Sequence, residues 1–183
     1  SAGGRDVVRA TAWRLARQDT VAVAGGAGEP LPGPEGLPTW DAVSLWGGGY
    51  IASLEIRSVD PPQPGHARAW IRARPALVES VDVDVLARFL TVVDTANGIA
   101  TRVDMTRWAF PNTDLTVHLF REPVGEWAGF DTEVAFGPSG VGLTSTRLYD
   151  EAGPVGRAEQ ILTLRPRTSH ATDATDATEG SSR

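Results

Sequence analysis

Hydrophobic and polar residues alternate along much of the chain, a pattern typical of β-strands that bury one face. Tyr50–Ser58 and His66–Arg74 alternate in this way on either side of a turn, Asp60–Gly65, that is rich in proline. We therefore expect these two strands to pair. Four more strands are expected further along, at Thr113–Glu122, Trp127–Phe136, Val141–Tyr149 and Val155–Arg165. Because the links between them are short and rich in turn residues, they should be antiparallel neighbours.

A single segment, Asp84–Arg102, has a helical period instead. Its hydrophobic residues recur every three or four positions and cover more than half of the helix circumference. This pattern predicts one long buried helix, with Asp82 or Asp84 as its N-cap. The order of the elements, two strands, a helix and four strands, predicts an α+β domain in which an antiparallel sheet curls around a central helix.

The two ends of the chain show other patterns. Arg5–Leu15 alternates like a lone strand, whereas Gly25–Pro38 holds five glycines and four prolines, a composition typical of a linker. His170–Arg183 repeats Ala-Thr-Asp and has almost nothing to bury, which predicts disorder. We therefore expect a strand segment at 1–18, a linker at 19–39, a folded domain at 40–167 and a disordered tail at 168–183.

Composition and charge exclude several classes of function. The chain of 183 residues has no cysteine, which excludes disulfides, thiolate catalysis and cysteine-ligated zinc. Its net charge of −6 argues against a protein that binds nucleic acid or an anionic membrane surface. No apolar run reaches the roughly 18 residues that a membrane span needs, so a cytoplasmic protein is expected. The three histidines have no metal-ligand spacing and the nucleotide-binding glycine motifs are absent, so we expect no metal and no cofactor.

The candidate chemistry consists of polar residues at positions expected to be buried. Asp94 and Asn97 share one face of the apolar helix, where an unpaired carboxylate is costly. Gln160 points with its apolar neighbours toward the core, so its amide needs a partner, and Asp94 or a water would serve. Together with Thr113 or Asp114, which open a strand, these residues could hold a water and accept its proton. The alternatives are that Asp94 only binds backbone donors near the helix end and that Gln160 faces solvent at an edge.

Three stretches contain Asp94, Thr113 with Asp114, and Gln160: LTVVD at 90–94, NTDL through FREP at 112–123, and EQ at 159–160. They resemble the bacterial acyl-CoA thioesterase II family and its relatives, which have the hotdog fold. The resemblance covers about Trp40 to Arg165. It implies that Asp94, Thr113 and Gln160 form a triad that activates a water to hydrolyse acyl-CoA to a free acid and coenzyme A, without a cofactor.

Members of this family are typically double hotdogs, so the resemblance implies that residues 1–18 are the closing strand of an incomplete first unit. A single unit would leave a sheet edge open, and we expect a dimer or pairing with a first unit. Asn97, Trp108, Phe110 and Asp114 are the expected substrate-binding residues. Because side chains alternate along a strand, the sequence leaves open whether Thr113 or Asp114 faces the site.

Two other functions are consistent with the same fold. A non-catalytic hotdog module could bind acyl chains or serve as an assembly domain. A hydratase is less favoured, because it usually needs a histidine on the helix and none lies between His66 and His118.

Overall fold

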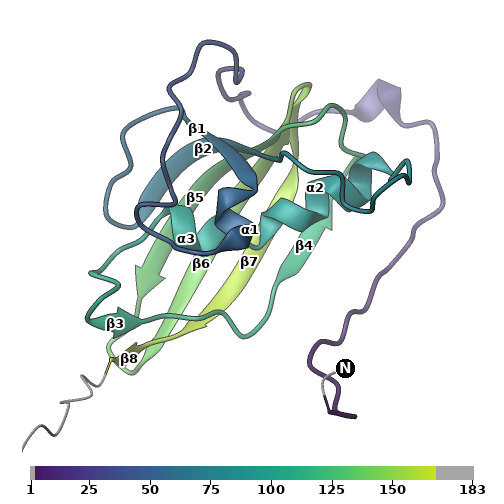
Figure 1. Cartoon of the computed structure of the whole chain (residues 1–183). Helices are drawn as coiled ribbons and strands as arrows, with labels where there is room; N and C mark the ends of the chain where they lie inside the picture. Colours follow the sequence, from purple (N-terminus) through teal and green to yellow (C-terminus); the bar gives the residue numbers. More distant parts are fainter. Residues whose placement is uncertain (1–2, 168–183) are drawn as a thin grey trace, which may run out of the picture.

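A six-stranded sheet forms the body of the protein (Figure 1), and every pair of neighbouring strands is antiparallel. The computed structural model describes residues 3–167, so the tail predicted at 168–183 lies outside the described residues. Across the sheet the strands are β1 (Leu54–Ser58), β2 (His66–Ala73), β5 (Ala128–Phe136), β6 (Val141–Asp150), β7 (Gly153–Thr163) and β4 (Thr116–Leu119). The alternating pattern thus identified all six strands of this sheet.

Two predicted boundaries are wrong because local turns replace the strand. The first strand begins at Leu54 and not at Tyr50, since Gly49–Ala52 form a short helix, α1. Gly48 precedes it with a φ of 124°, a conformation that a side chain would strain. The strand expected at Thr113–Glu122 shrinks to β4, and a separate ribbon of β3 (Trp108–Ala109) and β8 (Arg165–Pro166) forms beside it. Two-residue strands are too short to leave a periodic pattern.

The central helix is interrupted, which corrects the prediction of one helix over Asp84–Arg102. α2 (Val85–Val93) starts where the Asp84 side chain accepts a hydrogen bond from Leu86 N at 2.8 Å, so Asp84 is the N-cap. After Val93 the chain tightens, because Thr95 N donates to Val92 O three residues back at 3.1 Å. The helix resumes only as α3 (Ala96–Ile99). This break places Asp94 at a helix end, where its carbonyl is free to accept other donors.

The inner face of the sheet packs against one side of α2 and α3 (Figure 1). The helical residues buried there are Phe89, Val92, Val93, Ala96 and Ile99. They contact alternate residues of the strands, among them Ile71, Phe130, Leu148 and Leu162. Leu90 is exposed, so the helix buries one face rather than most of its circumference.

The second half of the expected linker packs on the opposite, outer face of the sheet. Leu31 is buried with Trp70, Trp127 and Tyr149 in a small separate core. Trp70 donates from Nε1 to Pro32 O at 2.7 Å, and the following residues pair with the free edge of β1, where Ser58 N donates to Pro38 O at 3.0 Å. Residues 31–39 are therefore part of the folded domain, because their few apolar side chains and free carbonyls find partners on the sheet.

The strand predicted at Arg5–Leu15 is not formed. Residues 6–20 contain no helix or strand, the turn η1 (Val21–Val23) follows, and Trp13 is 88% exposed. A strand needs a neighbour to satisfy its backbone groups, and no strand of the described sheet pairs with this segment. Its assignment to a first hotdog unit stays a prediction.

Candidate active site

Asp94 lies directly after α2, and two carboxamides from the sheet side of the helix bind its carboxylate. Gln160 in β7 donates from Nε2 to Asp94 Oδ1 at 2.8 Å and lies 3.4 Å from Asp94 O. Asn112 donates from Nδ2 to the same Oδ1 at 2.8 Å. Gln160 is only 1% exposed, so its inward orientation agrees with the alternation of β7. The geometry therefore joins one residue of the helix with two that are far away in the sequence.

The environment of Asp94 differs from the buried one that the sequence suggests. The residue is exposed, because the helix ends there and its side chain leaves the apolar face. Both donors are neutral amides, and both bind Oδ1. Oδ2 accepts no hydrogen bond from any residue in 3–167. The carboxylate is thus held in one orientation, with one oxygen open to water.

Thr113 and Asp114 do not contact the Asp94 carboxylate. The Thr113 hydroxyl lies 3.5 Å from Ile161 O, and Asp114 Oδ1 accepts from Ile161 N at 2.8 Å. Both side chains thus attach this segment to the edge of β7, and a role of Asp114 in substrate binding stays a prediction. The sequence left open whether Thr113 or Asp114 faces the site. In the structure the residue that faces it is Asn112, which precedes both. The only signal for it is the alternation of side chains, which shifts by one residue where β4 has not yet begun.

A cavity of about 370 Å³ adjoins Asp94. Asn97, Trp108 and Phe110, three of the residues expected to bind substrate, line it with Asp94, whereas Thr113, Asp114 and Gln160 do not. Its wall also contains residues that the sequence analysis missed, Trp40, Trp46 and Tyr50. The density of aromatic residues over 40–50 signals them, because residues 40–49 have no regular period and Tyr50 lies in α1 rather than in the strand expected there.

The aromatic wall is held by contacts to the helices. Trp46 donates from Nε1 to Gly98 O at 3.2 Å, and its ring meets that of Phe110 edge to face at 5.8 Å. The Tyr50 hydroxyl donates to Thr91 O at 2.8 Å and lies 3.0 Å from Thr95 Oγ1. Partial burial raises the pKa of Tyr50, and the nearby charge of Asp94 adds to this, although the Thr95 contact lowers it. Tyr50 is therefore a neutral donor that joins α1 to the central helix.

Within residues 3–167, no three His, Asp or Glu side chains gather closely enough to hold a metal ion. Of the helices in this part of the chain, none has the length and apolar character to cross a membrane.

The antiparallel sheet curled around a central helix is the hotdog fold, and solved structures share it. A putative thioesterase II from Thermobifida fusca YX matches with a TM-score of 0.59 at 16% identity, over 82% of this chain and 58% of that one. A hotdog protein of unknown function from Alicyclobacillus acidocaldarius matches with a TM-score of 0.55 at 12% identity, over 87% and 60%. The acyl-CoA thioesterase II TesB2 from Mycobacterium marinum matches with a TM-score of 0.52 at 16% identity, over 87% and 61%.

The sequence itself defines the family more closely. Residues 32–164 match the family model described as acyl-CoA thioesterase C-terminal domain, and the chain belongs to this family. It spans only about three fifths of the length of the three solved proteins, 58–61%. A comparison with curated proteins gives no match. The family boundary at residue 32 coincides with the point where the chain begins to pack on the sheet.

Proposed function

We propose that this chain hydrolyses acyl-CoA thioesters with a water that Asp94 activates. The observation that carries the proposal is the Asp94 carboxylate itself. Two neutral carboxamides hold Oδ1 at 2.8 Å each, while Oδ2 is open beside an apolar cavity. A carboxylate in this arrangement can accept a proton from water without a change in its orientation.

In the proposed reaction, the acyl chain lies in the cavity against Trp108 and Phe110, and Asn97 contacts the substrate near the thioester. Oδ2 of Asp94 takes a proton while the water oxygen bonds to the thioester carbonyl carbon. The carbon–sulfur bond then breaks, and the sulfur leaves as the thiol of coenzyme A with the proton that Asp94 took from the water, which returns Asp94 to its carboxylate form. The products are a free acid and coenzyme A, and no cofactor is needed.

The third member of the site has two candidates. Thr113 is the residue that the family resemblance implies for holding the attacking water, and its hydroxyl makes one long contact, 3.5 Å to Ile161 O, outside the cavity wall. Asn112 already binds Asp94 and orients it. We therefore propose Asp94 as the base, Gln160 and Asn112 as the groups that orient it, and Thr113 as the residue that holds the water.

The test is the release of coenzyme A from octanoyl-CoA, followed with a thiol reagent. The chain has no cysteine, so the reagent reports only the released thiol. The wild-type chain is expected to turn over, and Asp94→Asn, which keeps the shape of the side chain, is expected to lose the activity while remaining folded. Equal rates in the two proteins would overturn the proposal. Octanoyl-CoA binding without turnover in the wild type would favour the alternative, a non-catalytic acyl-binding or assembly module.

The open edge of the sheet supports a proposal about assembly. Residues 38–40 pair with the outer edge of β1, whereas β4 at the opposite end pairs only with β7 in the described structure. An unpaired edge strand favours pairing with another chain. We therefore propose a dimer, or pairing with a first hotdog unit, along β4. Light scattering tests this proposal, and a monodisperse monomer would contradict self-association. A cytoplasmic location stays a prediction.

A further inference from the structure

The cavity beside Asp94 has a second charged group in its wall. Arg165 and Arg167 line it from the β3–β8 ribbon, where Arg165 is paired with Ala109. They are alternate residues of an extended segment, so both side chains extend on one side of it. Arg167 is anchored, because its Nε donates to Trp108 O at 3.3 Å and its backbone N to Arg107 O at 2.8 Å.

These two guanidinium groups have no ion-pair partner within the described part of the chain. Among residues 3–167, Asp94 is the only carboxylate in the cavity wall. Both arginines are exposed at the cavity wall, and guanidinium groups bind oxyanions with paired hydrogen bonds. The rest of the wall is largely apolar, so the cavity presents an apolar body flanked by a carboxylate and a cationic end.

We propose that Arg165 and Arg167 form an oxyanion-binding subsite for the substrate of this cavity. The inference rests on the proposed thioesterase function and names the polar end of its substrate. The oxyanion has two sources, a phosphate of coenzyme A or a carboxylate at the far end of the acyl group. Both would be held by the same guanidinium contacts while the thioester lies at Asp94.

The experiment compares the wild type with the Arg165→Gln/Arg167→Gln double variant on three thioesters. They are octanoyl-CoA, octanoyl-N-acetylcysteamine, which lacks the phosphates, and the N-acetylcysteamine thioester of octanedioic acid. If the bound oxyanion is a phosphate of coenzyme A, the double variant should have a KM about tenfold above that of the wild type for octanoyl-CoA alone. If it is a carboxylate of the acyl group, the same rise should appear for the octanedioyl thioester. Arg157→Gln, an exposed arginine of β7 outside the cavity wall, is the matched control.

Calorimetric titration with coenzyme A separates this proposal from the proposed hydrolysis. A wild-type protein that binds coenzyme A but does not turn over would contradict the hydrolysis and leave the subsite testable by binding of coenzyme A and of octanedioate. If the double variant matches Arg157→Gln for all three thioesters and for both binding measurements, the subsite does not exist.

A separate observation concerns a polar row inside the sheet. Thr132, Thr144, Thr146 and Gln160 all point to the inner face, and all are buried. Thr132 and Thr146, partners across β5 and β6, share a hydrogen bond of 3.1 Å. Thr144 and Gln160 are partners across β6 and β7, yet Thr144 Oγ1 and Gln160 Oε1 have no hydrogen-bond partner in the described protein.

Two such atoms on facing residues require a shared partner, since an unsatisfied buried polar atom is costly. Paired side chains on one face have Cβ atoms about 5 Å apart, a spacing that one bridging water can span. A partner at Oε1 also determines the direction of the Gln160 Nε2 group. A flipped Gln160 carboxamide would turn its oxygen toward the Asp94 carboxylate, so a donor fixed at Oε1 keeps Nε2 directed at Asp94. We infer that Thr144 is a positioning residue, which orients Gln160 through one shared buried water.

Thr144→Val tests this role because it removes the hydroxyl and keeps the shape. Its kcat is expected to fall about tenfold with KM nearly unchanged, and Thr144→Ser is expected to restore kcat. Thr132→Val is the matched control, since it removes an equally buried hydroxyl whose partner is Thr146 and not Gln160. A structural role alone would lower the thermal stability of both valine variants and leave their kcat alike, which would overturn the inference.

A second readout is independent of hydrolysis. The side-chain amide protons of Gln160, followed by NMR, are expected to shift or broaden in Thr144→Val and to return in Thr144→Ser. Unchanged Gln160 resonances in a folded Thr144→Val protein would contradict the inference even if the chain had no thioesterase activity. If the valine variant does not fold, the same comparison is made with Thr144→Ala.

Discussion

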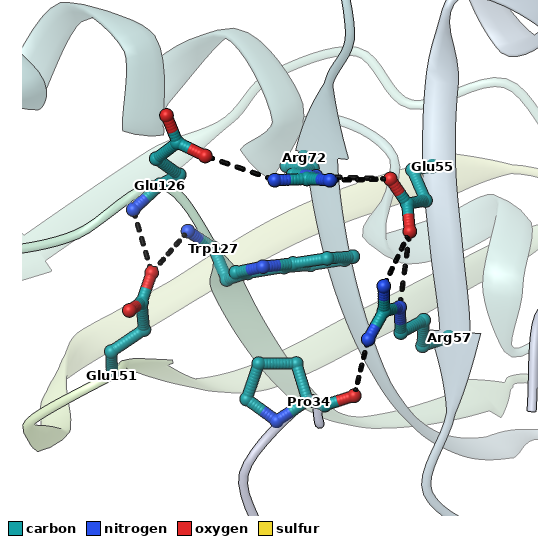
Figure 2. Close-up of polar contacts among 7 residues, drawn as sticks. All are labelled: Pro34, Glu55, Arg57, Arg72, Glu126, Trp127 and Glu151. Atoms are coloured by element: carbon teal, nitrogen blue, oxygen red, sulfur yellow. Dashed lines mark hydrogen bonds and ion pairs between the residues drawn. The ribbon is translucent and has the colours of Figure 1, made fainter. Parts of the chain in front are cut away.

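Two carboxylates on opposite faces of the sheet have contrasting surroundings. On the outer face, both oxygens of Glu55 accept from guanidinium groups, Oε1 from Arg57 at 2.8 and 3.0 Å and Oε2 from Arg72 at 2.8 and 3.0 Å (Figure 2). Both guanidinium carbons lie over the ring of Trp127, at 4.7 and 4.6 Å from its centroid. On the helix side, Asp94 has neutral donors on one oxygen only. The first carboxylate is occupied by charge, and the second is oriented but available.

This difference shows how the same functional group serves structure or chemistry. The hydrogen bond from Arg72 lowers the pKa of Glu55, against a smaller opposing effect of burial, and Arg57 lowers it further. Such a carboxylate is a poor proton acceptor, because protonation would break its ion pairs. Its partner Arg57 also donates to Pro34 O at 2.8 Å, so the network attaches residues 31–39 to the sheet (Figure 2). The donors to Asp94 are neutral amides, so its carboxylate forms no ion pair within residues 3–167.

Two isosteric substitutions, one at each carboxylate, test this difference with the largest expected effect. Asp94→Asn is expected to lower kcat/KM for octanoyl-CoA at least about 100-fold, the scale of a lost general base, with little change in Tm. Glu55→Gln is expected to lower Tm while the activity of the folded protein stays at the wild-type level. The measurements are initial rates and thermal unfolding on the same samples. A Glu55→Gln protein with impaired kcat would show that the two faces are coupled.

Asp150 is a third carboxylate. Like Glu55 it is paired with a guanidinium group, but its side chain is buried. Its side chain accepts from Arg121 at 2.5 and 2.6 Å and from Val124 N and Ala152 N at 2.8 Å each. Asp150→Asn leaves the guanidinium without its counter-charge, and we expect a loss of about 3 kcal/mol in the free energy of unfolding. Urea unfolding measures it. A loss below about 1 kcal/mol, as at exposed ion pairs, would show that Arg121 is compensated by solvent.

The same two structural carboxylates predict an acid limit of stability. Burial raises the pKa of Asp150, but the hydrogen bonds from Arg121, Val124 N and Ala152 N lower it more, so its net pKa is below the ordinary value of 3.8, and that of Glu55 is below 4.5. The unfolded chain therefore binds protons first as the pH falls, and these groups stabilise the fold fully only above those ordinary values. The free energy of unfolding should decline below about pH 4.5, less steeply in Glu55→Gln and Asp150→Asn. Equal slopes in all three proteins would contradict this.

The smallest expected effects separate the two candidates for the third site residue. Asn112→Ala removes one of the two donors to Asp94 and is expected to lower kcat about tenfold. Thr113→Val removes a hydroxyl with only a long contact to Ile161 O, and its effect should be similar only if Thr113 holds the water. Steady-state kinetics decides between them. A full-rate Thr113→Val protein would remove Thr113 from the site.

Much of the fold was predictable because the spacing of hydrophobic residues along the chain indicates which side chains are buried. The six strands of the sheet alternate over four to eleven residues, so their inner faces could be read directly from the sequence. The N-cap at Asp84 follows from local hydrogen bonding, which the sequence also encodes. Gln160 could be placed toward the core for the same reason. The interruption of the central helix after Val93 could not be predicted, because a tightened turn leaves the helical spacing of apolar residues intact.

The parts that escaped prediction depend on contacts between distant segments. Leu31 and Pro34 look like linker residues until the outer face of the sheet supplies Trp127 and Arg57 as partners. Trp46 and Tyr50 line the cavity because Trp46 donates to Gly98 O and Tyr50, in α1, donates to Thr91 O. Asn112 is indistinguishable from a turn residue without the position of Asp94. In each case the deciding partner lies more than 15 residues away.

The sequence by itself determined the α+β class, the six strands of the sheet, the inward position of Gln160 and the family resemblance, because all of these follow from local period or local motif. The tertiary structure alone decided which polar groups meet. It ended the helix at Asp94, brought Asn112 rather than Thr113 to the carboxylate, and left Oδ2 open beside the cavity. Side-chain alternation changes face with a shift of one residue, and that shift depends on how an irregular segment docks against β7.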